Sequence, residues 1–181
     1  MLRQVESTHR LAVQSVLRWP GPVPGMSSLA YAILPVLASV EISSSRIGEL
    51  VVYWQSLPRH NGLRLRRDVA PADIPALLPA LSIVEFPTGT ASARFRLYGT
   101  ALTTNFGYDL TGMTLEEAGL SPERTRYWNE VYVRVVATRQ PLFGRDRAAE
   151  RDFITFEWVK LPLSSDGTAV DMALCGYDFI R

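Results

Sequence analysis

Apolar and polar positions recur with two different periods after residue 45, and each period predicts one kind of element. Two segments place apolar residues at the i, i+3, i+4, i+7 spacing of a helix face; one follows serines at 43–45 and the other follows Ser121-Pro122-Glu123. Serine hydroxyls cap first-turn amides and proline suits a first turn, so both predicted helices have defined starts. The apolar positions are Ile47, Leu50, Val51 and Trp54 in the first helix, and Trp128, Val131, Tyr132, Val135 and Val136 in the second.

Five further segments are predicted as strands. In the second of them, Ala93, Phe95 and Leu97 alternate with polar residues, a period of two that indicates one buried face. The element order is a helix, two strands, several short helices that include residues 100–107, the long helix and three strands. This order fits an α+β fold, in which a five-stranded antiparallel sheet carries helices on one face. The predicted strands are residues 82–86, 93–98, 142–148, 153–163 and 170–180.

Residues 1–45 are predicted to form an N-terminal helical extension that precedes a domain at 46–181. Residues 1–18 fit a short amphipathic helix, and the proline- and glycine-rich segment 19–25 interrupts it. The apolar run at 29–40 is shorter than the about 20 residues that a membrane helix needs, so we expect no transmembrane segment. We expect instead a hydrophobic helix that docks on its own domain or on a partner, and a start of translation at Met26 stays open.

Composition places the chain among ordinary globular proteins. Apolar residues make up 47% and charged residues 20%, with 19 basic against 18 acidic side chains. This balance provides no overall attraction to nucleic acid, and we expect no nucleic-acid partner. The clearest basic cluster, Arg64, Arg66 and Arg67, is interpreted as a solvated loop beside Asp68.

The few cysteine and histidine residues restrict metal chemistry. Cys175 is the only cysteine, and His9 and His60 are the only histidines. The chain therefore has no internal disulfide, no thiolate zinc cluster and no multi-histidine metal site. A single free thiol suits a reducing compartment, so we expect a cytoplasmic protein. We interpret Cys175 as a small buried hydrophobic residue, with a redox-sensing role as the less favoured alternative.

Two sequence blocks resemble a PAS-like family that is common in alphaproteobacteria and often stands alone. The first block is Tyr53-Trp54 followed by residues 68–79, and the second is residues 94–102 followed by 106–112. The resemblance extends through Leu161-Pro162-Leu163 and covers residues 46–181. It implies the PAS fold firmly. A role in bacterial signalling follows from it more loosely, and it implies no enzymatic activity.

No cofactor is predicted. Haem-binding PAS domains present an axial histidine from the helical side of the pocket, and no histidine lies between residues 61 and 181. The cysteinyl-flavin photocycle of this fold needs a cysteine after an asparagine in a short helix. Here Phe106 follows Asn105, and Cys175 lies on the last predicted strand. Histidine-ligated haem in the core and cysteinyl-flavin photochemistry are therefore disfavoured, whereas plain flavin binding stays open.

Nine side chains are predicted to point toward the interior between the sheet and the helices. If the helices stand off the sheet, these side chains line a pocket for a small apolar or aromatic ligand, with Tyr132 as its polar handle. If they do not, the same side chains simply fill the core. The nine are Phe95, Leu97, Leu102, Phe106, Trp128, Tyr132, Phe156, Trp158 and Met172.

Arg96 is the candidate polar anchor for a ligand carboxylate. The alternative has Arg96 pairing with Asp109, which would also cap the turn at Leu110. We expect a PAS-like sensory or regulatory module that binds a small apolar or aromatic ligand, a partner protein or both. The partner is either a second copy of the chain in a homodimer or another signalling protein. One alternative is a pure interaction domain with a filled core. A remote alternative is a small cone-shaped α+β enzyme using Tyr98, Tyr132 and Asp109, although no catalytic motif is present.

Overall fold

The computed structural model of the chain describes residues 43–148 and 151–180. The predicted helix at 1–18 and the apolar run at 29–40 lie outside the described residues, so the role of the N-terminal extension stays a prediction. None of the described helices combines the length and the apolar character needed to cross a bilayer.

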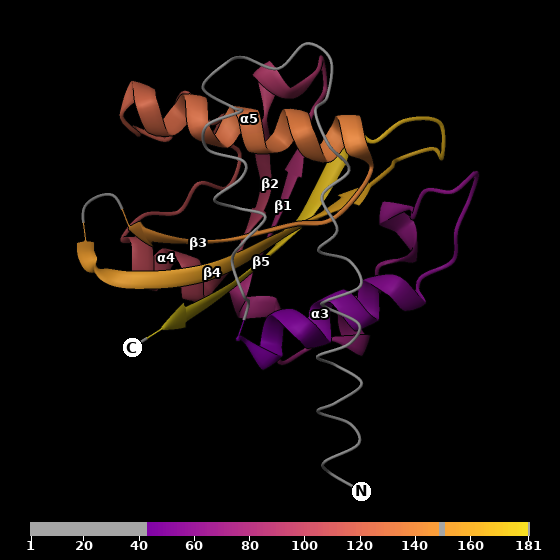
Figure 1. Cartoon of the computed structure of the whole chain (residues 1–181), viewed down its shortest axis with the longest axis horizontal. Helices are drawn as coiled ribbons and strands as arrows, with labels where there is room; N and C mark the ends of the chain where they lie inside the picture. The colour runs from indigo at the N-terminus through magenta and orange to yellow at the C-terminus, as the bar shows by residue number, and fades with distance from the viewer. Residues whose placement is uncertain (1–42, 149–150, 181) are drawn as a thin grey trace, which may run out of the picture.

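A five-stranded antiparallel sheet forms the centre of the molecule, which confirms the predicted architecture (Figure 1). The strand order is β2-β1-β5-β4-β3, so the two strands at the start of the domain continue the three-stranded meander at its end. The strands are β1 Leu81–Glu85, β2 Arg94–Tyr98, β3 Leu142–Ala148, β4 Arg151–Leu163 and β5 Met172–Ile180.

Helices cover both faces of this sheet. Helices α4 (Thr100–Phe106) and α5 (Pro122–Thr138) lie on one face, as predicted, whereas α3 (Ser45–Ser56) lies on the opposite face (Figure 1). The end of β4 at residues 158–163 is apolar except for Lys160, which fits a strand that is covered on both faces. Its consecutive residues Trp158 and Val159 point to opposite faces and belong to two separate core clusters, one under α5 and one under α3.

The apolar stripe of α3 is buried against its own sheet and leaves little apolar surface for a partner. Leu50 and Val51 are buried, and the stripe packs on β4 and β5. The contact is close at Gly176, where a Cβ atom would lie 2.4 Å from Cδ2 of Leu50. A glycine at this position therefore allows the helix to approach the strand.

The start of α3 is tied to β4 by a buried carboxylate. Glu157 is fully buried and accepts hydrogen bonds from the backbone N–H groups of Ser43 (3.1 Å) and Ser44 (2.8 Å). The Ser44 hydroxyl accepts from the N–H of Ile47 and so caps the helix. Burial alone would raise the pKa of the Glu157 carboxyl, but hydrogen bonds from Arg145, Ser43 and Ser44 hold it below its ordinary value.

A β-bulge in β2 corrects one predicted side-chain direction. Val84 pairs with Phe95, yet the preceding residue Ile83 pairs with Leu97, so Arg96 is an extra residue on β2. Because an inserted residue exchanges the two faces of a strand, Leu97 points away from the pocket side and is 42% exposed. Tyr98 takes the inward position instead and packs against the cluster under α5.

The basic cluster at 64–67 is only partly a solvated loop, so that interpretation is wrong for Arg64. The guanidinium of Arg64 lies 3.8 Å from the ring centroid of Trp54 and donates to the carbonyl of Gln55 at 2.9 Å. Only 4% of Arg64 is exposed, and desolvation by burial, followed by the charge of Arg59, lowers its pKa to about 10. Arg64 therefore packs as part of the α3 side of the core.

Candidate ligand-binding site

The face of the sheet that carries α5 forms the base of the candidate site. Alternate residues of β4 and β5 point toward α5, and the register pairs Trp158 with Tyr177 and Phe156 with Phe179. From the other side, α5 contributes Trp128 and Tyr132 because its apolar residues follow the helical spacing. The segment after α4 closes the remaining side with Leu110 and Leu115.

A cavity of about 50 Å³ lies between these surfaces. A water molecule needs roughly 10–15 Å³ measured in this way, so the space holds about three to five waters or one small chemical group. Tyr98, Phe106, Tyr108, Leu120 and Arg124 are half-buried, whereas the other lining residues are buried. The lining residues are Phe95, Tyr98, Phe106, Tyr108, Leu110, Leu115, Leu120, Arg124, Trp128, Tyr132, Ala148, Phe156 and Tyr177.

Five of the nine predicted pocket residues line this cavity: Phe95, Phe106, Trp128, Tyr132 and Phe156. Leu102 and Trp158 are buried in the same cluster but do not line the cavity. Leu97 was expected to point inward and is instead turned out by the β2 bulge. Met172 was also expected inward, but it packs on the α3 side of the sheet because its neighbour Ala173 takes the α5 side.

Most of the aromatic surface is used to pack rings against one another. Phe106 contacts Phe156 edge-on with ring centroids 5.1 Å apart, and Trp128 contacts Trp158 at 5.3 Å. Trp158 lies directly over Gly144, where a Cβ atom would come within 2.3 Å of its ring. The aromatic residues therefore fill most of this core and leave one small space.

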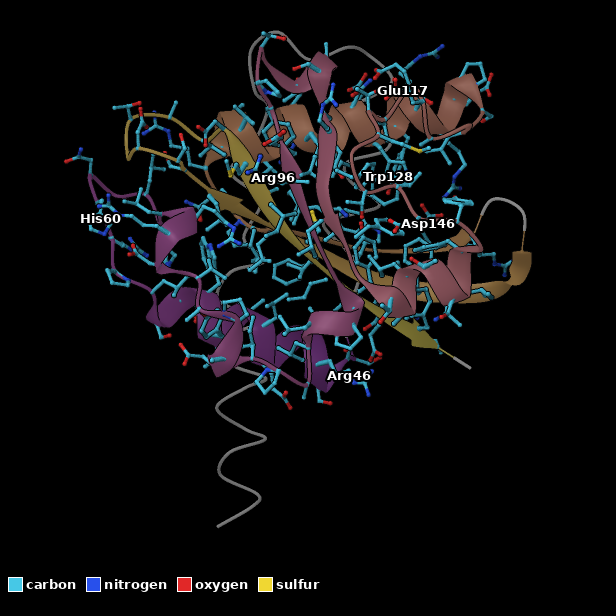
Figure 2. All side chains as sticks on the ribbon, turned by 180° about the vertical axis from the view of Figure 1, so that it is seen from behind. Arg46, His60, Arg96, Glu117, Trp128 and Asp146 are labelled. Atoms are coloured by element: carbon cyan, nitrogen blue, oxygen red, sulfur yellow. The ribbon has the colours of Figure 1, made fainter. Side chains whose placement is uncertain are left out.

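Arg124 is a lining residue that the sequence reasoning missed. It donates to Oδ2 of Asp146 at 3.2 Å and to the carbonyl of Arg147 at 3.0 Å, which fixes it between α5 and β3. Its Nε is buried and has no hydrogen-bond partner in the described residues. The available signal was its i, i+4 spacing to Trp128, since residues four apart share one helix face. Figure 2 shows Trp128 and Asp146, which come from α5 and β3.

Arg96 does not reach the cavity, and its predicted pairing with Asp109 is wrong. The Arg96 side chain is exposed on β2 and pairs with Glu85, whose Oε2 is 3.2 Å away. Arg96 is the inserted residue of the β2 bulge, and its side chain lies beside Glu85 on the neighbouring strand β1. Asp109 does form the expected turn cap, because its Oδ1 accepts from the Thr111 N–H at 2.8 Å. Arg96 is therefore not the polar anchor of the cavity, and its ion-pair partner is Glu85 and not Asp109.

The buried hydroxyl and thiol groups around the cavity stay protonated. Burial raises the pKa of Tyr132 and of Tyr177 above the ordinary value, and burial likewise raises the pKa of the Cys175 thiol. Cys175 is fully buried, as expected for a small hydrophobic residue. Tyr132 and Tyr177 line the cavity, so their neutral hydroxyls offer hydrogen-bonding positions to a ligand, whereas Cys175 does not line it.

Lys160 is a second residue that the sequence reasoning missed. It lies in the middle of β4, is fully buried, and points to the α5 side with Trp158. Its Nζ donates to the Tyr177 hydroxyl at 2.7 Å. Desolvation by burial lowers the pKa of its amine.

The described part of the chain offers no evident metal centre. No group of three or more His, Cys, Asp or Glu side chains in it is arranged to hold a metal ion. His60 pairs with Asp68 at 3.0 Å, and Figure 2 shows it at the edge of the molecule, far from Trp128.

The comparison with protein-family models agrees with this architecture. A family model described as a PAS domain matches residues 42–176, most of the chain. The PAS domain of Bordetella pertussis BvgS is similar at 18% identity with a TM-score of 0.49, over 61% of this chain and 82% of that chain. An RNA-binding light-oxygen-voltage receptor is similar at 12% identity with a TM-score of 0.39, over 98% of this chain and 61% of that chain. No curated protein matches the chain.

Proposed function

Because this chain belongs to the PAS domain family, we propose that it is a sensory or regulatory module that binds a small apolar or aromatic ligand between the sheet and α5. The observation that carries the proposal is the cavity of about 50 Å³ in an otherwise close-packed aromatic core. Ligand sites are typically apolar with a few placed polar groups, and here Arg124 and Tyr177 are such groups.

The half-buried residues of the lining give the cavity a means of accepting a larger ligand. Phe106 is the last residue of α4, Tyr108 follows it after Gly107, and Leu120 precedes α5. Side chains at such positions can change rotamer at lower cost than the buried rings of Trp128 and Phe156. A ligand larger than a few waters would therefore displace this rim first.

The β4 strand provides a route from the cavity to the start of α3. Phe156 lines the cavity, and the next residue, Glu157, lies on the opposite face and holds the N–H groups of Ser43 and Ser44. A ligand that shifts Phe156 would move this attachment. In this proposal the signal leaves through the start of α3 toward a partner protein.

A pure interaction domain is the second candidate and has less support. The first helix was its expected contact surface, but the apolar stripe of α3 is buried on its own sheet. The predicted homodimer would therefore depend on other surfaces of the chain. Mass measurement in solution, on the full chain, distinguishes a dimer from a monomer.

Ligand binding is tested on the purified full chain by native mass spectrometry and by thermal shift with butanol and benzyl alcohol. We expect a rise in Tm that is lost in Ala148→Leu, because Ala148 lines the cavity and leucine fills it. Leu97→Gln is the matched control, since Leu97 is exposed on the other face. Binding at saturating ligand, about 100-fold above Kd, would stabilise the fold by about 2.7 kcal/mol. The absence of both a co-purifying ligand and a thermal shift would refute the proposal.

A further inference from the structure

Lys160 is the only lysine in the chain, and every other basic side chain that carries a fixed charge is one of 18 arginines, since Lys and Arg together number 19. Arginine stays protonated in proteins, whereas a lysine amine readily loses its proton when it is buried. The only side chain able to provide a neutral primary amine therefore lies at the centre of the core and not on the surface.

Four aromatic rings surround the Lys160 amine. Nζ lies 4.3 Å from the ring centroid of Tyr177, 4.9 Å from Trp128, 5.5 Å from Trp158 and 5.8 Å from Tyr132. Three of these rings, Tyr177, Trp128 and Tyr132, also line the cavity. Lys160 itself does not line the cavity, so a ligand reaches the amine only when one of these three rings moves aside.

The surroundings of the amine provide no compensating negative charge. The titratable groups that face it are the phenols of Tyr132 on α5 and Tyr177 on β5 and the thiol of Cys175 on β5, all of which burial keeps protonated. Among the described residues, Lys160 forms no salt bridge with a carboxylate. A buried ammonium without a counter-charge is costly, and the four ring faces offset only part of that cost. Burial therefore lowers the pKa of the Lys160 amine and favours its neutral, nucleophilic form.

We propose that Lys160 captures the carbonyl group of a small apolar or aromatic aldehyde or ketone as an imine. This inference rests on the proposed function, because the carbonyl compound must first enter the cavity. The inference narrows the proposed ligands to carbonyl compounds, because the end of the ligand that faces Tyr177 must carry a carbonyl carbon.

The reaction needs only the groups present. The lone pair of Nζ attacks the carbonyl carbon, and the π pair of the C=O bond moves to oxygen. A proton passes from nitrogen to that oxygen, and the Tyr177 hydroxyl, 2.7 Å from Nζ, is placed to relay it. The nitrogen lone pair then forms the C=N bond as the C–O bond breaks, and the hydroxyl group leaves with the second N–H proton as water. Amine and carbonyl therefore give imine and water without an oxidant or a reductant.

Reductive trapping tests the inference on the full chain. The protein is incubated at pH 7 with butanal or benzaldehyde and sodium cyanoborohydride, which reduces the imine to a stable secondary amine. Intact mass counts the adducts, and peptide mapping assigns them to Lys160 or to the N-terminal amine. We expect Lys160 to react about tenfold faster or more in the folded chain than in urea, because an unfolded lysine has a pKa of about 10.4 and is protonated at this pH.

Two variants separate chemistry from folding. Lys160→Met keeps the approximate length of the side chain without the amine. This variant should lose the adduct at residue 160 and keep the adduct at the N-terminal amine. Tyr177→Phe keeps the ring but removes the hydroxyl, and it should slow the Lys160 adduct several-fold. Labelling of only the N-terminal amine in the folded wild-type chain would overturn the inference, with no variant needed.

Thermal shift with butanol and benzyl alcohol distinguishes failure of the imine inference from failure of the proposed ligand binding. They have the same carbon skeletons as the two aldehydes but cannot form an imine. If the alcohols raise Tm while Lys160 stays unmodified, the cavity binds ligands and only the imine is refuted. If neither the alcohols raise Tm nor the aldehydes modify Lys160, both proposals fail.

Discussion

Replacing Glu157 by glutamine should detach the start of α3 and lower the free energy of unfolding. Glu157 is fully buried and accepts from two backbone N–H groups, the Ser43 hydroxyl and Arg145. Glutamine keeps one carbonyl oxygen, but its NH₂ group then faces donors. Loss of one partner of a buried ion pair costs about 3–5 kcal/mol. The Arg145 side chain is 43% exposed and can be hydrated, so the Arg145–Glu157 ion pair contributes only about 0–1 kcal/mol of that loss.

The expected loss is therefore about 2–4 kcal/mol, measured by urea unfolding with an unchanged m-value. The matched control is Glu116→Gln, because Glu116 is exposed and its loss should change stability by less than about 0.5 kcal/mol. The folded pKa of Glu157 is lowered, so its contribution is complete above the unfolded value of about 4.3 and declines as the pH falls through the folded value. A loss below about 0.5 kcal/mol, or a difference that does not shrink between pH 7 and pH 3, would refute this reasoning.

Three further substitutions test other parts of the structure. Gly144→Ala places a Cβ within 2.3 Å of the Trp158 ring and should cost about 1–3 kcal/mol with a shift in tryptophan fluorescence; an unchanged Tm and spectrum would contradict the packing. Lys160→Met should raise stability at pH 7 by about 1–3 kcal/mol. The gain should shrink toward pH 10, because the unfolded chain binds the proton that the folded amine lacks; a gain independent of pH would argue against a neutral amine. Arg64→Lys should lose about 1 kcal/mol in urea unfolding by weakening the stacking on Trp54, and no loss would show that the stack is immaterial.

Periodicity predicts the sheet and its helices well because burial of apolar side chains decides both. The α5 stripe from Trp128 to Val135 and the strand at 142–148 are found where the pattern places them. The bulge at Arg96 cannot be recognised from the apolar pattern. The inserted residue turns the following side chains of β2 to the opposite face, but the sequence still reads as an unbroken alternation. For that reason Leu97 was placed inside and Tyr98 outside.

The polar residues of the site were harder to predict than its aromatic ones. A lysine or arginine is expected at the surface, and only the packed structure reveals that Lys160 and Arg64 are enclosed. Arg124 looks like an ordinary helix-surface residue until β3 brings Asp146 beside it. Five of the nine predicted pocket residues line the cavity because aromatic residues on an inward face converge whatever the details of the loops.

The two edges of the sheet differ in what they offer to another polypeptide strand. The outer side of β2 is occupied by its own chain, since Phe95 exchanges hydrogen bonds with Gly112 and Met113, and Ala93 accepts from Leu115. No described segment pairs with the outer side of β3, where Arg145 and Arg147 are exposed. Charged side chains on an open edge oppose uncontrolled strand addition, so growth into fibrils through this sheet is discouraged. A partner that extends the sheet would have to join at β3 and bring acidic side chains to meet those arginines.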